Sequence, residues 1–213
     1  MEIVRGVHQV DGIIGNSYII NGKKMVVIDT GLPGNSRKII NYIRVGLKRS
    51  PNDVTTIILT HYHAGHSGNV YELKNLTGAI IAIHTDDADY VSGKKEMPER
   101  CTPIQHLTPD TLLQDGDKIA GLTCVHCPGH TAGSIALYDP NRRILFTGDT
   151  LGYDDGKVQC PGEESSDNME EVKSSIITLS GLDYDLVLPG HGSPLKPDAA
   201  ARVSEFSRSL SQQ

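Results

Sequence analysis

The sequence predicts an α/β fold in which β-sheets are covered by helices, and we expect one domain over residues 1–213. Two observations lead to this expectation. Short runs of β-forming residues alternate along the chain with segments whose apolar residues recur at helical spacing. A chain of 213 residues with 38% hydrophobic residues can also bury one sizeable core, and one domain is the better expectation at this length.

The first quarter of the chain predicts an antiparallel meander followed by a helix. β-type runs at Ser17–Ile20 and Met25–Ile28 are separated by Asn-Gly-Lys-Lys, and Asn-Gly is a strong hairpin signal. The helix is predicted by apolar residues at helical spacing, Ile39, Ile40, Ile43 and Leu47. Ser36 is placed to cap its start, and Pro51 is placed to stop it.

Strands and helices then alternate to the end of the chain. We expect strands at Ile57–Leu59, Ile80–Ile83, Leu122–Val125, Ile135–Tyr138, Ile144–Phe146 and Leu186–Leu188. Three further helices are predicted by apolar faces at Val70, Leu73 and Leu76, at Met169, Val172, Ile176 and Leu179, and at Ala199, Val203, Phe206 and Leu210. Residues 92–110 and 152–168 show little periodicity, and we interpret them as lids, binding loops or disordered insertions.

Composition restricts the partners and the compartment. The chain has 20 basic and 26 acidic residues, a formal charge of −6, and its basic residues are scattered, so we expect neither nucleic acid nor a membrane surface as partner. Four cysteines are few for this length, which favours a reducing, cytoplasmic compartment. No signal-like or membrane-spanning apolar run is evident, so we expect a soluble protein. With nucleic acid and membranes disfavoured, we expect a small-molecule substrate. Composition leaves the oligomeric state open.

Three histidines within six residues follow the predicted strand Ile57–Leu59. In an extended loop His61 and His63 point to the same side, because side-chain direction repeats every two residues, so both imidazoles can reach one ion. A turn at Ala64-Gly65 can bring His66 towards a neighbouring position. The alternative interpretation is a surface loop that is rich in histidine.

Three more predicted strand ends carry a metal-binding type of residue beside glycine. They are His130 in Pro-Gly-His, Asp149 in Gly-Asp-Thr and His191 in Pro-Gly-His-Gly. Glycine permits a tight turn and a close approach of the backbone to a shared site. Each motif alone is typical of an ordinary turn. Together with the histidine loop they suit one or two divalent ions such as zinc, with iron or manganese as alternatives.

At this point the sequence resembles the metallo-β-lactamase superfamily. The resemblance is carried, in the family's order, by Ile28-Asp-Thr-Gly31, Thr60-His-Tyr-His-Ala-Gly-His66, Cys127-Pro-Gly-His-Thr131, Thr147-Gly-Asp-Thr150 and Pro189-Gly-His-Gly192. It covers nearly the whole chain and implies an αββα sandwich of two mixed sheets. It also implies two metal sites, the first held by His61, His63 and His130 and the second by His66 and His191.

The resemblance further assigns three single positions. Asp149 would bridge the two metals, and Asp29 resembles the family's structural aspartate beneath the histidine loop, where a partly buried carboxylate can orient ligands. Gly65 departs from the family, whose pattern has aspartate there as a ligand of the second site with a proposed role in proton transfer. We therefore expect a second site that binds its ion more weakly.

The function implied is hydrolysis by a metal-bound hydroxide. A divalent ion lowers the pKa of bound water to about 7, and the sequence has no Gly-x-Ser-x-Gly elbow and no phosphate-binding glycine loop. The bond could be an ester, lactone, thioester, amide or phosphodiester. Only about 22 residues follow His191, which disfavours the glyoxalase II-like branch with its helical substrate domain. The acidic, compact chain also disfavours RNA-processing branches. Asp149, where the best-known zinc β-lactamases have cysteine, makes β-lactams doubtful substrates and favours a small lactonase or esterase.

Two other classes of function stay open. One is a mononuclear iron dioxygenase similar to the persulfide dioxygenases, with His61, His130 and Asp149 as its triad. The other is a relative that binds metal without turnover. Among the remaining candidates we interpret His8, His84, His106, His126, Cys124 and Cys127 as packing or surface residues. Tyr62 and Tyr153 are candidates for substrate contact.

Overall fold

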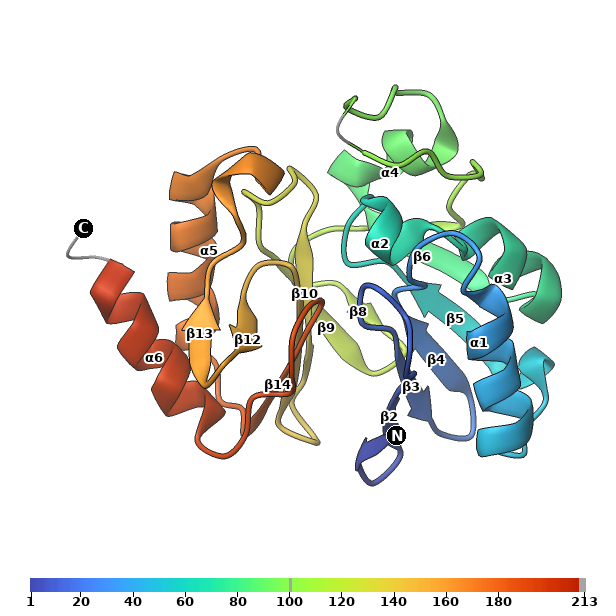
Figure 1. The fold of residues 1–213 in the computed structure, drawn as a ribbon, viewed down its shortest axis with the longest axis horizontal. Coiled ribbons are helices and arrows are strands. Elements are labelled where there is room, and N and C mark those ends of the chain that lie inside the picture. Colours follow the sequence, from blue (N-terminus) through green and yellow to red (C-terminus); the bar gives the residue numbers. More distant parts are fainter. Residues whose placement is uncertain (100, 211–213) are drawn as a thin grey trace. The chain divides into compact units, whose positions relative to one another are not determined.

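The computed structural model describes residues 1–99 and 101–210, and it divides into two compact units, Met1–Leu113 and Gln114–Gln213. Each unit consists of a β-sheet and the helices that pack on it (Figure 1). The two sheets are both mixed, so the predicted class of mixed sheets with helices is confirmed.

The first unit contains a seven-stranded sheet in chain order. Its strands are β1 (Glu2–Val4), β2 (Val7–Gln9), β3 (Tyr18–Asn21), β4 (Met25–Ile28), β5 (Val54–Ile58), β6 (Ile80–His84) and β7 (Thr111–Leu113). Strands β1 to β4 form the predicted antiparallel meander, and β4 to β7 run parallel. Parallel neighbours place the loops that follow β4, β5 and β6 at one edge of the sheet.

The helices of this unit are α1 (Ser36–Asn41), its π-helical continuation η1 (Tyr42–Gly46), the 3₁₀ turn η2 (Pro51–Asp53), α2 (Ala64–Ser67), α3 (Val70–Thr77) and α4 (Thr85–Ser92). Their apolar side chains share one core with the sheet, in which Ile39, Ile43, Ile57, Val70 and Leu73 are fully buried. Burial of aliphatic side chains, worth about 1.5 to 3 kcal/mol each, holds these helices on the strands.

Two expectations for the first unit were wrong, and one helix was not predicted. Asn35, not Ser36, precedes α1, and the Ser36 hydroxyl donates instead to Glu72 at 2.5 Å. The helix ends at Gly46, ahead of Pro51, which is the first residue of η2. Leu76 is 43% exposed, because the buried face of α3 is formed by Val70, Leu73 and Thr77. Helix α4 was not predicted at all, since its first turn is acidic and few of its residues are apolar.

The second unit contains a five-stranded sheet in the order β14-β11-β10-β9-β8 and a separate two-stranded hairpin. The sheet is formed by β8 (Lys118–Ile119), β9 (Leu122–His126), β10 (Ile135–Asp139), β11 (Ile144–Gly148) and β14 (Leu186–Pro189). The hairpin is formed by β12 (Gly152–Asp154) and β13 (Lys157–Gln159). The helical segments are the 3₁₀ turn η3 (Glu163–Ser165), α5 (Met169–Ser180) and α6 (Ala199–Leu210).

The two stretches that we expected to be loops differ. Residues 93–99 and 101–110 contain no helix or strand, as expected, and Arg100 lies outside the described residues. Residues 152–168 contain the hairpin and η3, so that expectation was wrong for much of the stretch. The hairpin strands are three residues each, too short for an alternating pattern to stand out.

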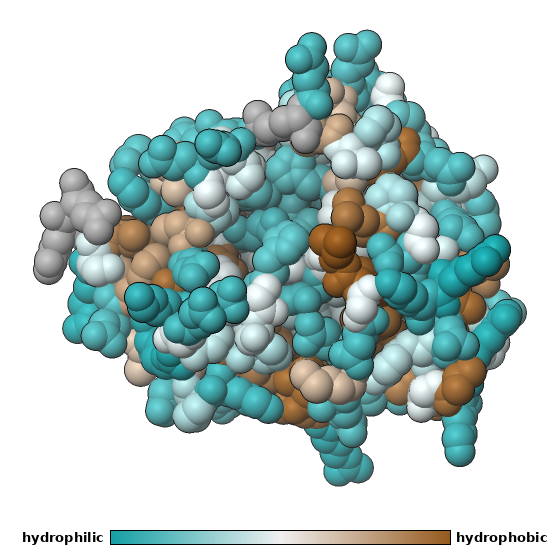
Figure 2. All heavy atoms as spheres, in the orientation of Figure 1, coloured by the Kyte–Doolittle hydropathy of each residue, from teal (hydrophilic) through white to brown (hydrophobic). Residues whose placement is uncertain are grey.

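Hydrophilic side chains cover most of the face in Figure 2, with apolar residues in small patches. Among residues 1–99 and 101–210, no helix has the length and apolar character needed to cross a bilayer.

Candidate metal centre

In the first unit, the histidine loop lies at the carboxyl edge of the parallel strands. Asp29 follows β4, and Thr60 and His61 follow β5, which is the parallel neighbour of β4. The two strand ends therefore lie side by side, and side chains from segments about 30 residues apart in the sequence come into contact.

Asp29 is the centre of this contact. It is 2% exposed, and its Oδ1 accepts from the Thr60 amide at 2.8 Å, whereas its Oδ2 accepts from the Thr60 hydroxyl at 2.7 Å. The same Oδ2 lies 2.8 Å from Nδ1 of His66. Asp29 also adopts a φ of 58°, a backbone conformation that Asp and Asn adopt more readily than most residues. The expected position of Asp29 beneath the histidine loop is confirmed.

These hydrogen bonds determine which ring nitrogen of two histidines carries the proton. A carboxylate only accepts, so Nδ1 of His66 donates to Asp29 and Nε2 carries the lone pair. The Thr60 hydroxyl has one hydrogen, which it donates to Asp29, and it must therefore accept from Nδ1 of His61, 3.1 Å away. Both rings thus present Nε2 in the state that a metal ligand requires.

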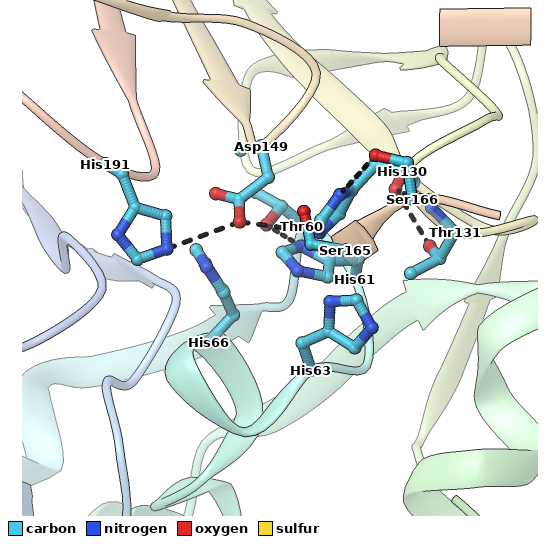
Figure 3. Close-up of polar contacts among 12 residues, drawn as sticks. Thr60, His61, His63, His66, His130, Thr131, Asp149, Ser165, Ser166 and His191 are labelled. Atoms are coloured by element: carbon cyan, nitrogen blue, oxygen red, sulfur yellow. Dashed lines mark hydrogen bonds and ion pairs between the residues drawn. The ribbon is translucent and has the colours of Figure 1, made fainter. Parts of the chain in front are cut away.

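The three imidazoles of the loop gather as the spacing predicts. The ring centroids of His61 and His63 are 4.9 Å apart, and those of His61 and His66 are 4.1 Å apart. The short helix α2 supplies the predicted turn between His63 and His66. Figure 3 shows the three rings rising from this one segment.

Tyr62, between the first two histidines, serves the loop and not a substrate. It is 1% exposed, its ring stacks on Tyr90 at 4.0 Å, and its amide donates to the buried carboxylate of Asp87 at 2.9 Å. The expectation that Tyr62 contacts substrate was wrong, because its ring is buried between Tyr90 of α4 and the His63 ring, 4.6 Å away. Asp87 carried no recognisable signal in the sequence, since it lies among other acidic residues of a helix start.

In the second unit, sheet topology brings the other three candidates together. Strands β11 and β14 are parallel neighbours, so Asp149 after β11 and His191 after β14 lie at one edge. Strand β9 runs in the same direction, because both β9 and β11 are antiparallel to β10, and the loop after β9 carries His130 to that edge.

Asp149 lies between the two histidines (Figure 3). Its Oδ2 is 3.5 Å from Nε2 of His130 and 3.3 Å from Nε2 of His191. Ligand atoms about 2.0 to 2.1 Å from one tetrahedral zinc are themselves about 3.3 to 3.4 Å apart, so this spacing is compatible with shared coordination of an ion. The His130 side chain is 3% exposed and that of His191 is 56% exposed, so packing alone does not hold His191 in place.

The segment 152–168 and the start of α5 hold the His130 loop. Nδ1 of His130 lies 3.4 Å from the Ser166 hydroxyl, which donates to the Gly162 carbonyl at 2.9 Å and so can accept from His130. Nε2 of His130 is then the nitrogen directed at Asp149. Gly129, with a φ of 124°, accepts from the amide of Asn168 at 2.8 Å. Ser166 was missed in the sequence because it lies in a stretch without periodicity.

Imidazole nitrogens and a carboxylate are the donor types that zinc, iron and manganese accept, so both sets of residues fit a divalent ion. Three of the other histidines have polar contacts of their own, and a ring nitrogen of His84 also lies within 4.8 Å of an Asp86 oxygen. His8 lies 3.2 Å from the Tyr42 hydroxyl, Nδ1 of His84 accepts from the Asp86 amide at 3.3 Å, and Nε2 of His126 lies 2.9 Å from the Ala132 carbonyl. Cys124 and Cys127 are fully buried, which confirms their packing role.

The fold and these residues are those of one family. Residues 10–191 match the model of the metallo-beta-lactamase superfamily, and the chain belongs to that superfamily. Its relatives with this fold include metallohydrolases, and the chain is a hydrolase of this class.

Three relatives resemble the chain along most of its length. The probable metallo-hydrolase YflN of Bacillus subtilis is 26% identical, over 91% of this chain and 86% of the relative. The acyl-coenzyme A thioesterase MBLAC2 of Homo sapiens is 29% identical, over 83% and 72%. The probable metallo-hydrolase MJ0888 of Methanocaldococcus jannaschii is 29% identical, over 85% and 89%.

Solved structures agree on the fold. A metallo-β-lactamase of Cronobacter sakazakii with a HARLDQ motif has a TM-score of 0.79 and 20% identity, over 100% of this chain and 92% of that one. The metallo-beta-lactamase family protein TTHA1429 of Thermus thermophilus has a TM-score of 0.74 and 22% identity, over 99% and 81%.

Proposed function

We propose that the chain hydrolyses an ester-type carbonyl compound at a zinc centre, and that a small acyl thioester is the first substrate to test. The ligands proposed are the six residues predicted from the sequence, His61, His63, His66, His130, Asp149 and His191. When bound, a divalent ion supplies a water of lowered pKa and polarises the substrate carbonyl.

The observation that carries this proposal is that hydrogen bonds within the protein already orient the imidazoles of His61 and His66. Asp29 holds His66 directly and holds His61 through Thr60. With Nδ1 of both rings donating within this buried network, each Nε2 needs a partner of its own, and a metal ion would supply it. Carboxylate–histidine contacts of this kind also raise the basicity of metal ligands. In the second unit, Asp149 supplies a carboxylate close to two more ring nitrogens. We propose that Asp149 is the bridging metal ligand that the sequence predicted.

The choice of thioester comes from the relatives. The human relative is named an acyl-coenzyme A thioesterase, and the chain covers 72% of its length. The two microbial relatives are named only as probable metallo-hydrolases, which fits the same class without naming a bond. Small esters and lactones are therefore the comparison substrates.

The test combines metal analysis with hydrolysis. The purified chain should contain zinc and release free thiol from acetyl- or decanoyl-coenzyme A. His61→Ala and His130→Ala should each lose metal and at least about 100-fold in rate, whereas His106→Ala, outside the proposed ligand set, should retain both. Iron at one ion per chain, with oxygen consumed and no ester or thioester cleaved, would replace the proposal with the dioxygenase alternative. Tight zinc binding without hydrolysis of any substrate would indicate the non-catalytic alternative.

A further inference from the structure

The hairpin formed by β12 and β13 begins three residues after Asp149 and lies beside α6 (Figure 1). Its strands pair antiparallel, with Gly152 opposite Gln159 and Asp154 opposite Lys157. The proposed hydrolysis assigns no role to this element, although it connects directly to the segment that carries a proposed ligand.

The hairpin contacts the loop that carries His191. The Ser193 amide donates to the Tyr153 carbonyl at 2.8 Å, and Tyr153 forms a parallel bridge with Gly192. Gly192 has a φ of 83°, and a Cβ there would lie 2.3 Å from the Tyr153 carbonyl oxygen. Only glycine permits so close an approach, so the backbone next to His191 packs directly against the backbone of the hairpin.

The other side of the same loop is held by the sheet. The Gly190 amide donates to the Gly148 carbonyl at 2.6 Å, one residue before Asp149. His191 therefore lies between two backbone contacts, one from β11 and one from the hairpin. These two contacts fix the backbone on either side of His191, whose Nε2 lies 3.3 Å from Oδ2 of Asp149.

Arg202, on α6, holds the hairpin in turn. Its Nη2 donates to the Gly156 carbonyl at the hairpin turn at 2.7 Å, and its guanidinium lies over the Tyr153 ring, 4.6 Å from the centroid. A guanidinium in this geometry stacks on the ring and donates in its own plane at the same time, which a lysine ammonium does not reproduce.

We propose that Arg202 is a positioning residue for the metal centre: through Tyr153 and the hairpin it keeps His191 in place beside Asp149. The inference rests on the proposed function, because it takes His191 as a ligand. It assigns the hairpin a structural supporting role, which differs from the lid, binding loop or disordered insertion considered for this stretch of the sequence.

The experiment measures metal affinity as well as backbone protection. Arg202→Met removes the guanidinium and keeps a long apolar side chain, and Arg208→Met is the matched control, because Arg208 lies on the same helix and donates to Ser204 within it. Tyr153→Phe should behave as wild type, since it keeps the ring and the backbone carbonyl. Zinc is titrated against a chelator, and hydrogen exchange is followed at the Ser193 amide of the metal-free protein.

We expect Arg202→Met to weaken the more weakly held zinc about 10-fold, to leave the tighter one unchanged and to speed exchange at Ser193. Arg208→Met should change none of these. Equal loss of both ions would indicate general destabilisation and overturn the inference. Faster exchange with unchanged zinc affinity would also overturn it. A His191→Ala variant separates the two proposals: if it leaves both affinities unchanged, the proposed ligand set fails and the inference fails with it, whereas a loss there without a loss in Arg202→Met rejects the inference alone.

Discussion

Oδ2 of Asp29 lies 2.8 Å from Nδ1 of His66 and also accepts the Thr60 hydroxyl, so one buried carboxylate oxygen controls the orientation of two histidines. Removing the charge at this position should therefore affect metal binding more than folding.

Asp29→Asn is predicted to weaken metal binding about 10- to 100-fold, the range seen when an outer partner of a metal ligand is changed. Asparagine tolerates the φ of 58°, so the backbone should be kept. Chelator competition measures the affinity, and thermal unfolding checks the fold. Asp89→Asn, on an exposed side chain, is the control. An unchanged metal affinity would show that Asp29 is structural only.

Gly65→Asp is predicted to strengthen the weaker metal and to raise hydrolytic turnover by about 10² to 10⁴, the range of general acid–base assistance. The structure has room for it: nothing lies within 4 Å of a Cβ at Gly65, and its φ is outside the left-handed region. Metal content and turnover are measured together. Two tightly held ions with no gain in any hydrolysis would favour the oxygenase or binding-protein alternatives.

The wild-type chain is predicted to hold nearer one ion than two when metal is limiting, because Gly65 offers no carboxylate to the second site. Excess metal should raise the content. Elemental analysis after graded dialysis against a chelator measures this, and two ions retained through prolonged chelation would contradict it.

Stability at alkaline pH should depend on Cys127. Burial raises the pKa of this thiol to about 12, above the value of about 8.5 in an unfolded chain. The stabilising contribution of the protonated thiol is complete below about pH 8.5 and is lost as pH rises towards 12, by at most about 1.4 kcal/mol per pH unit. Urea unfolding between about pH 8 and 10.5 should show a shallower decline for Cys127→Ala than for wild type. If the free energy of unfolding declines with pH at the same rate in wild type and in Cys127→Ala, the prediction is refuted.

Gly129→Ala is predicted to destabilise the chain by about 2 to 4 kcal/mol and to disturb the His130 loop. A Cβ at Gly129 would lie 2.3 Å from the Val172 amide nitrogen, and φ is 124°. Gly121→Ala is the matched control, because Gly121 has a φ of 86° with nothing within 4 Å, and it should cost only about 1 kcal/mol. If Gly129→Ala and Gly121→Ala lose the same free energy of unfolding in chemical denaturation, backbone strain and not the close approach of α5 explains the requirement for glycine at position 129.

The sequence alone predicted the alternation of strands and helices and the two sets of histidine and aspartate residues at strand ends. It could do so because long apolar runs report burial directly, and because His61 and His63 share a side by strand geometry. Short or polar elements escaped it. Helix α4 and the hairpin β12–β13 carry too few apolar residues for a period to be recognised.

Only the tertiary structure decided how the proposed ligands are oriented. Asp29 and Thr60 belong to neighbouring parallel strands, and the contact between them depends on sheet register, which no local pattern encodes. The tautomer assigned to His61 follows from a chain of donors and acceptors that exists only once those strands pair. Likewise Arg202 is one of many charged helix residues in the sequence. It acquires a role because α6 packs beside a hairpin whose carbonyl supports the loop of His191.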